Sequence, residues 1–216
     1  MPDTFTKVPE PTLGRLPWYL SYAKIAKQNG EVTLSSTQIA NQIGVDASQV
    51  AKDFSYAQVI GKTRVGYNID ELIHTLEEFL GFSHVHKAFL FGAGSLGGSL
   101  LHDNGLLQYG LDIVAAFDIK YELIGTHINH IPIQHTSRFA EIQRESPATV
   151  GVLTVPAWQA QSVADLMVAG GIKAIWNFTP YRITVPDEIV LQNTSIYAHL
   201  AVIYNRLSEK KENNKR

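Results

Sequence analysis

The pattern of apolar and polar positions changes once along the chain. The first eighty residues have helical spacing, and the first predicted helix buries a face formed by Trp18, Tyr22, Ile25 and Ala26. Two short helices follow on either side of Gly44, and Ser35 and Asp46 each precede a glutamine by three residues, which is capping-box spacing. Residues 61–69 predict a hairpin, and the segment DELIHTLEEFLG predicts a further helix. Helix, helix-turn-helix and hairpin is the order of a winged-helix domain.

From Lys87 onward, continuous apolar runs alternate with helical segments. The runs KAFLF, LDIVAAF, TVGVLTV and KAIWNF are typical of parallel strands buried on both faces. A last helix carries an apolar stripe at Ile196, Leu200, Ile203, Tyr204 and Leu207, and its polar tail is expected to fray. This alternation predicts a doubly wound parallel sheet of the Rossmann type. We expect an α/β chain with a mostly α winged-helix domain at 1–82, a Rossmann domain at 83–194 and a C-terminal helix with its tail at 195–216.

Composition limits the classes of function. The chain has no apolar stretch of membrane-spanning length, and its N-terminus lacks the apolar core of a secretory signal, so we expect a cytoplasmic protein with no membrane contact. Cysteine is absent, which excludes disulfides and thiolate chemistry. The net charge is −2, yet lysines and arginines outnumber acids between residues 12 and 68. That segment is therefore the candidate for contact with a polyanion.

Residues 89–101, FLFGAGSLGGSLL, place a glycine loop between a predicted strand and a predicted helix. In this context Gly92 makes a tight turn, Gly94 leaves room for a pyrophosphate, and Gly97 lets the helix pack closely on the strand. Asp118 ends the next strand, where an acid accepts hydrogen bonds from the adenosine ribose. The pattern predicts an NAD(H) site. The alternative is a glycine turn that binds nothing, with a solvated aspartate.

Two further segments end predicted strands. Residues 154–156, TVP, and 177–180, NFTP, either border a nicotinamide or simply start the next structural element with a proline. The histidines of the segment THINHIPIQH have no carboxylate at ligand spacing, so we expect no metal site there; they are His127, His130 and His135. The second half contains no Tyr-x-x-x-Lys, His–Asp pair or arginine clamp, so no catalytic residue is predicted.

The first half contains a candidate DNA-reading surface. Residues 47–56 predict a recognition helix, whose expected solvent face is formed by Ser48, Gln49, Lys52 and Asp53. Lys62 and Arg64 of the hairpin are placed to reach phosphates or a minor groove, with Tyr67 packed at its base. The alternative is a small helical domain whose charges form a solvated face.

The motifs, taken in order, resemble the Rex family of bacterial redox-sensing transcriptional repressors. The resemblance covers residues 8–207 and rests on RLPWYL, SSTQIANQIGVDASQVAKDFSY, VGYNI, FGAGSLGGSLL, IVAAFD, GVLTVP and GIKAIWNFTP. It implies a homodimer in which the C-terminal helix swaps onto the partner subunit. It also implies that the protein binds double-stranded operator DNA when NAD⁺ dominates and releases it when NADH rises.

The resemblance also assigns residues by position. The implied cofactor-binding residues are Gly92, Ala93, Gly94, Ser95, Leu96, Gly97, Asp118, Thr154, Val155, Pro156, Asn177 and Phe178. The implied DNA-binding residues, which join Ser48 and Gln49 of the helix face, are Lys52, Ser55, Tyr56, Lys62, Arg64 and Gly66.

This chain departs from the family pattern in several places. Many relatives have arginine where it has Ala51, which predicts a different operator and lower affinity; many also have Phe-Gly where it has the segment AQVIG. Asp103 and Ser195 stand where many relatives have a tyrosine and an aspartate of the redox relay, so the switch is expected to use other contacts. Two alternatives stay open. The first is a small NAD-dependent dehydrogenase or CoA-binding Rossmann enzyme, and the second is a dinucleotide-binding adaptor without DNA binding.

Overall fold

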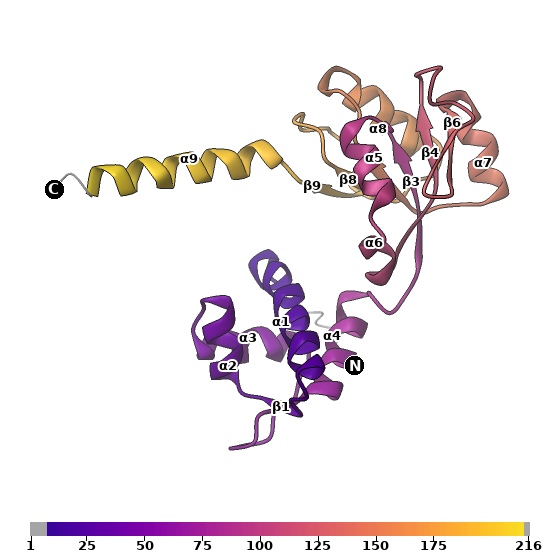
Figure 1. Ribbon diagram of the computed structural model, residues 1–216. Coiled ribbons are helices and arrows are strands. Elements are labelled where there is room, and N and C mark those ends of the chain that lie inside the picture. The colour runs from indigo at the N-terminus through magenta and orange to yellow at the C-terminus, as the bar shows by residue number, and fades with distance from the viewer. Residues whose placement is uncertain (1–7, 214–216) are drawn as a thin grey trace. The chain divides into compact units, whose positions relative to one another are not determined.

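The computed structural model describes residues 8–213 (Figure 1). The chain forms two compact units, which divide between His84 and Val85. The first seven residues of the expected winged-helix domain and the last three of the expected tail lie outside the described residues. Within the described range, no helix combines the length and apolar character needed to cross a bilayer.

From residue 8 onward, the N-terminal unit contains four helices and a small antiparallel sheet. Ser35 caps the second helix in a full capping box, whereas Asp46, expected to do the same for the third, makes no side-chain cap hydrogen bond. Gly44 and Gly81 end helices in the left-handed conformation. The elements are α1 (Glu10–Gln28), β1 (Thr33–Leu34), α2 (Ser36–Ile43), α3 (Ala47–Tyr56), β2 (Tyr67–Asn68) and α4 (Ile69–Leu80).

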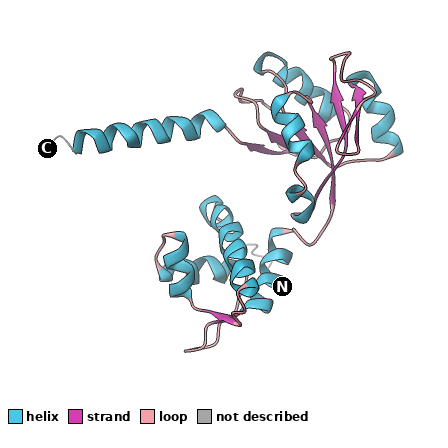
Figure 2. Ribbon diagram, in the orientation of Figure 1, coloured by secondary structure: helices cyan, strands magenta, loops and turns pink. Residues whose placement is uncertain are grey.

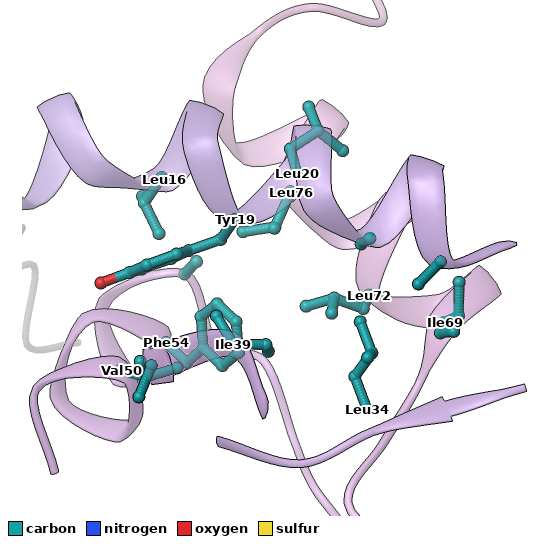
Figure 3. Close-up of a cluster of buried hydrophobic side chains, with 14 residues drawn as sticks. Leu16, Tyr19, Leu20, Leu34, Ile39, Val50, Phe54, Ile69, Leu72 and Leu76 are labelled. Atoms are coloured by element: carbon teal, nitrogen blue, oxygen red, sulfur yellow. The ribbon is translucent and has the colours of Figure 1, made fainter. Parts of the chain in front are cut away.

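The predicted buried face of α1 is only partly confirmed: Ala26 is buried and Tyr22 packs against the core, but the remaining core residues of α1 lie on another stripe. The buried face of α1 is formed by Leu16, Tyr19 and Leu20 (Figure 3), together with Ala23 and Ala26. The prediction that Trp18 and Ile25 are buried is wrong, because these side chains are 66% and 51% exposed. Helix α1 carries apolar residues on two stripes, and spacing alone does not select the one that packs on α3 and α4.

The C-terminal unit is a seven-stranded Rossmann-type sheet with the order β5-β6-β4-β3-β7-β8-β9. Every neighbouring pair is parallel except β5–β6. The strands are β3 (His86–Phe91), β4 (Leu111–Asp118), β5 (His127–Ile128), β6 (Ile131–His135), β7 (Val150–Leu153), β8 (Ala174–Asn177) and β9 (Val190–Asn193). The helices are α5 (Ser95–His102), α6 (Gly105–Gln108), α7 (Phe139–Glu145), α8 (Ala160–Ala169) and α9 (Ile196–Asn213), with 3₁₀ turns η1 (Thr136–Arg138) and η2 (Ala157–Gln159) (Figure 2).

Both faces of the central strand β3 are buried, as its continuous apolar run predicts. On one face Phe89 and Phe91 pack edge-on against Phe139 of α7, with ring centroids 6.0 and 5.1 Å apart. On the other face Ala88 and Leu90 belong to a cluster that includes Leu101 of α5. This two-sided packing fixes the carboxyl end of β3, and the glycine loop starts there.

The last helix continues further than expected. Helix α9 extends through Asn213, so the described part of the polar tail from Ser208 onward is helical. Its lysines and glutamates favour helix, which explains the extension. The apolar stripe predicted on α9 is exposed, with Tyr204 62% and Leu207 52% accessible.

Candidate functional site

The glycine loop turns tightly between β3 and α5. Gly92 has φ +98°, and a Cβ there would lie 2.9 Å from the carbonyl carbon and oxygen of Thr154. At Gly97, a Cβ would collide with the carbonyl oxygen of Gly92, so the first turn of α5 lies directly on the loop. Nothing lies within 4 Å of a Cβ built on Gly94, at the N-terminus of α5. The loop therefore combines close packing on its inner side with open space beside a helix N-terminus, which suits an anionic group.

Asp118 holds this loop in place from the end of β4. Its side chain is 8% exposed, and Oδ2 accepts a 2.7 Å hydrogen bond from the backbone N–H of Ala93. Oδ1 accepts two more, from the N–H groups of Ile119 and Lys120 at 2.7 and 2.9 Å. A carboxylate has further acceptor capacity beyond these three bonds. Asp118 is therefore a structural brace for the glycine loop as well as a candidate acceptor for ribose hydroxyls.

A cavity of about 880 Å³ opens above the carboxyl ends of the strands. This volume lies within the range of small-molecule and cofactor sites. Eight of the predicted cofactor residues line it: Gly92, Gly94, Leu96, Asp118, Thr154, Val155, Pro156 and Phe178. The other four lie outside the lining: Ala93, Ser95, Gly97 and Asn177.

Asn177 is instead the hub of a buried network behind the cavity wall. It is 1% exposed, and its Nδ2 donates to the carbonyl of Tyr181 and to Oδ1 of Asn193, both at 2.8 Å. Its Oδ1 accepts from the N–H and the hydroxyl of Thr179. Because Thr179 and Phe178 line the cavity, Asn177 shapes the wall without facing the space.

Sequence reasoning missed several lining residues, among them Thr136, Trp158, Thr179, Ile196 and Tyr197. Thr179 lies within the NFTP segment, although it was not assigned to the site, and Thr136, Trp158 and Tyr197 belong to no recognisable motif. Their only signal is position, because each follows the end of a strand on the sheet edge where α/β folds bind ligands.

In the N-terminal unit, the predicted recognition helix is α3. Ser48, Lys52 and Ser55 are exposed beside Ala51, whereas Gln49 and Tyr56 are half-buried. Gln49 is partly engaged inside the unit, since its Nε2 donates a 2.9 Å hydrogen bond to Asp53. The exposed surface of α3 is therefore narrower than the sequence predicted.

The prediction that Asp53 faces solvent is wrong. Its side chain is fully buried and accepts hydrogen bonds from Thr12, Arg15, Tyr19 and Gln49. The Arg15 guanidinium provides two of these bonds, at 2.7 and 2.8 Å. Local helical spacing misplaced Asp53 because the partners on α1 lie 34 to 41 residues away. This network fastens the recognition helix to α1.

The ionisation of Asp53 follows from this network. Burial by itself would raise the pKa of the carboxyl, but hydrogen bonds from Arg15, Tyr19, Gln49 and Thr12 outweigh burial and lower the pKa to about 2. For Tyr19, burial and then the hydrogen bond to Asp53 raise the pKa to about 12. At neutral pH the unit therefore contains a charged carboxylate with a neutral phenol and a cationic guanidinium beside it.

The wing is a tight turn stabilised by backbone contacts. Lys62 and Gly66 form an isolated antiparallel bridge, and Arg64 lies between them with φ +65°. A Cβ on Gly66 would collide with the carbonyl oxygen of Leu34, so this glycine fixes the wing against β1. As expected, Tyr67 packs at the base, with its ring edge-on to Phe54 at 4.8 Å. The turn leaves the side chains of Lys62 and Arg64 exposed.

Comparisons with known proteins match both units. The family model described as "Putative DNA-binding protein N-terminus" matches residues 7–55, and the CoA binding domain model matches residues 84–181. A redox-sensing transcriptional repressor Rex of Bacteroides thetaiotaomicron is 62% identical over 203 residues, which cover 94% of this chain and 92% of the relative. The Rex protein of Porphyromonas gingivalis is 57% identical over 202 residues, with 94% and 93% covered.

Solved structures agree along nearly the whole chain. A crystal structure of RSP in complex with β-NAD⁺ and operator DNA has a TM-score of 0.90 at 30% identity and covers 97% of both chains. RSP in complex with β-NADH has a TM-score of 0.87 at 30% identity and covers 97% of this chain and 99% of that one. With relatives this similar over this length, the chain belongs to the Rex family of redox-sensing transcriptional repressors.

Proposed function

We propose that this chain is a homodimeric repressor that binds operator DNA through its N-terminal unit and NAD(H) in the cavity of its C-terminal unit. NAD⁺ permits DNA binding, and NADH releases the DNA. The observation that supports this proposal most directly is that a single chain contains two features. One is a cavity beside the glycine loop, which Asp118 holds in place, and the other is a helix-turn-helix with an exposed wing. Support comes from the RSP structures, whose titles name β-NAD⁺ with operator DNA and β-NADH.

The proposed DNA surface lies on α3 and the wing. Helix α3 presents Ser48, Lys52 and Ser55 toward the duplex, with Gln49 and Tyr56 at its margin, and the wing presents Lys62, Arg64 and Gly66. The lysines and Arg64 would contact phosphates or the minor groove, while the hydroxyl and amide groups of α3 would read base edges. Ala51 on the same face offers no hydrogen bond, so this surface would read fewer bases than one with arginine there.

In the proposed coenzyme site, the N-terminus of α5 and Gly94 hold the pyrophosphate, and Asp118 accepts from the adenosine ribose. The negative charge of Asp118 would repel a 2′-phosphate on the ribose. We therefore propose that the site binds NAD(H) rather than the phosphorylated form. When bound, the coenzyme supplies a ring that is cationic when oxidised and neutral when reduced. Because the relatives that match nearly the whole chain are named as transcriptional repressors, we propose sensing rather than turnover.

The coenzyme acts through a population shift. A ligand moves an equilibrium only by its differential affinity for the two states, and a full swing between bound and free repressor needs about 5.5 kcal/mol. Two sites in a dimer would share this requirement. The proposed dimer arm is α9, whose exposed stripe consists of Ile196, Leu200, Ile203, Tyr204 and Leu207.

Lys52→Ala tests the DNA surface. If Lys52 contacts a phosphate, operator affinity falls about tenfold and the slope of log affinity against log salt concentration falls by about one. The measurement is fluorescence anisotropy of a labelled operator at several salt concentrations. Lys173→Ala is the matched control, because Lys173 is an exposed lysine of the C-terminal unit. Equal operator binding by wild type and Lys52→Ala would remove Lys52 from the DNA surface, whereas no operator binding by wild type would favour an adaptor that does not bind DNA.

A further inference from the structure

An exposed tryptophan lies at the wall of the coenzyme cavity. Trp158 belongs to η2, the turn that follows the carboxyl end of β7, and it is 80% exposed. It lines the cavity together with Thr154, Val155 and Pro156. A large aromatic side chain usually buries much of its surface. Its exposure leaves the indole of Trp158 accessible to a molecule bound in this ligand-sized space.

The topology places Trp158 in one half of the sheet. Strands β3, β4 and β6 form the half that ends in Asp118, which is the adenosine half under the proposed function. Strands β7, β8 and β9 form the other half, over which the second nucleotide of a dinucleotide lies. Trp158 follows β7, and Phe178, which also lines the cavity, follows β8. The inference drawn here rests on the proposed function, because it concerns the nicotinamide ring.

The charged residues that line the cavity are confined to the adenosine half of the sheet. Among the described residues that line the cavity, Asp118 is the only carboxylate and Lys120 the only cation, and both lie at the end of β4. No lining carboxylate is therefore available in the nicotinamide half to distinguish a charged ring from a neutral one. The face of an indole makes this distinction, because its quadrupole attracts a cation over the ring.

We propose that Trp158 is a specificity-determining residue for the oxidation state of the coenzyme. Its indole face stacks on the nicotinamide ring and stabilises the oxidised, cationic ring relative to the reduced, neutral one. Dispersion and apolar burial act on both rings, but the cation–π attraction acts on the oxidised ring alone. Trp158 thereby raises the NADH/NAD⁺ ratio at which the operator is released.

Trp158→Leu tests this proposal, because leucine keeps apolar contact but has no aromatic face. The affinity for NAD⁺ is expected to fall about three- to tenfold, while the affinity for NADH changes less than about twofold. Phe at the same position retains an aromatic face and is expected to give an intermediate ratio. Isothermal titration calorimetry with each coenzyme measures both affinities. Trp18→Leu is the matched control, since Trp18 is 66% exposed on α1, outside the cavity.

A charge-transfer absorption band gives a second readout. The complex of wild type with NAD⁺ is expected to show such a band between the indole and the oxidised ring, and Trp158→Leu is expected to lose it. Equal changes in the two affinities, or none, would overturn the role of Trp158 and leave the proposed function intact. A wild-type protein that binds neither coenzyme would overturn the proposed function, and with it this inference.

Discussion

Replacement of Gly97 by alanine is expected to abolish coenzyme binding and to lower the free energy of unfolding of the C-terminal unit by about 3 kcal/mol. The added Cβ collides with the carbonyl oxygen of Gly92, a backbone atom that cannot rotate away. Helix α5 must then shift from the loop, and both the turn at Gly92 and the helix N-terminus lose their positions. Urea unfolding measures the stability of the variant, and calorimetry with NADH measures its binding.

Gly98 provides the matched control for this prediction. It follows Gly97 in α5, but a Cβ there makes only ordinary contacts, at 3.8 Å from the Ala93 carbonyl oxygen and a methyl group of Ile128. Alanine is a better helix former than glycine, so Gly98→Ala is expected to raise stability by about 0.5–1 kcal/mol and to bind NADH as wild type does. If Gly97→Ala and Gly98→Ala have the same free energy of unfolding and the same affinity for NADH, α5 does not pack directly on the loop at Gly97.

Asp53→Ala is expected to destabilise the N-terminal unit by about 3–5 kcal/mol, with loss of operator binding. The change removes a fully buried carboxylate and leaves Arg15, Tyr19, Thr12 and Gln49 without their common acceptor. The guanidinium of Arg15 then remains half-buried without its counter-charge. Amide hydrogen exchange along α1 and α3 measures the effect separately from the C-terminal unit.

An exposed ion pair in the same unit is the control. Asp70 pairs with Lys27 at 2.6 Å, but the two side chains are 72% and 59% exposed, so Asp70→Ala is expected to cost less than about 1 kcal/mol. If Asp53→Ala costs as little as Asp70→Ala, the network does not fasten α3 to α1.

The stability of the N-terminal unit is also expected to depend on pH through the negative charge of Asp53. Its folded pKa of about 2 lies below the ordinary value of 3.8, so the unfolded chain binds a proton first as the pH falls. The contribution of Asp53 to stability is therefore complete above about pH 5 and declines between about pH 4 and pH 2. Asp53→Asn is expected to lack this decline.

Local sequence patterns were sufficient for the parts of the molecule that are built from neighbouring residues. The turn at Gly92, the close packing at Gly97 and the position of Asp118 all lie within one strand–loop–helix–strand unit, and their spacing encodes them. The capping box at Ser35 and the helix end at Gly81 are equally local.

Features that depend on distant partners could not be predicted in this way. The local pattern places Asp53 on the surface of an amphipathic helix. In the folded chain, Arg15, which lies 38 positions earlier, donates a hydrogen bond to it. Asn177 ends a strand, where binding residues are expected, but Asn193 and Tyr181 accept the hydrogen bonds of its amide group. Helix α1 has two apolar stripes, and only tertiary packing selects the one that includes Leu16 and Tyr19. In each case, tertiary contacts with residues that are distant in the sequence override the preference of the local pattern.

The central claim is that the oxidation state of the coenzyme in the glycine-loop cavity controls the affinity of α3 and the wing for DNA. The most direct test holds the total coenzyme concentration constant, varies the NADH/NAD⁺ ratio, and follows operator binding by fluorescence anisotropy. We predict that operator affinity falls about 10⁴-fold between pure NAD⁺ and pure NADH, which corresponds to the roughly 5.5 kcal/mol that a full swing requires. Superimposable binding curves at every ratio, from a protein shown to bind both coenzymes, would contradict the account.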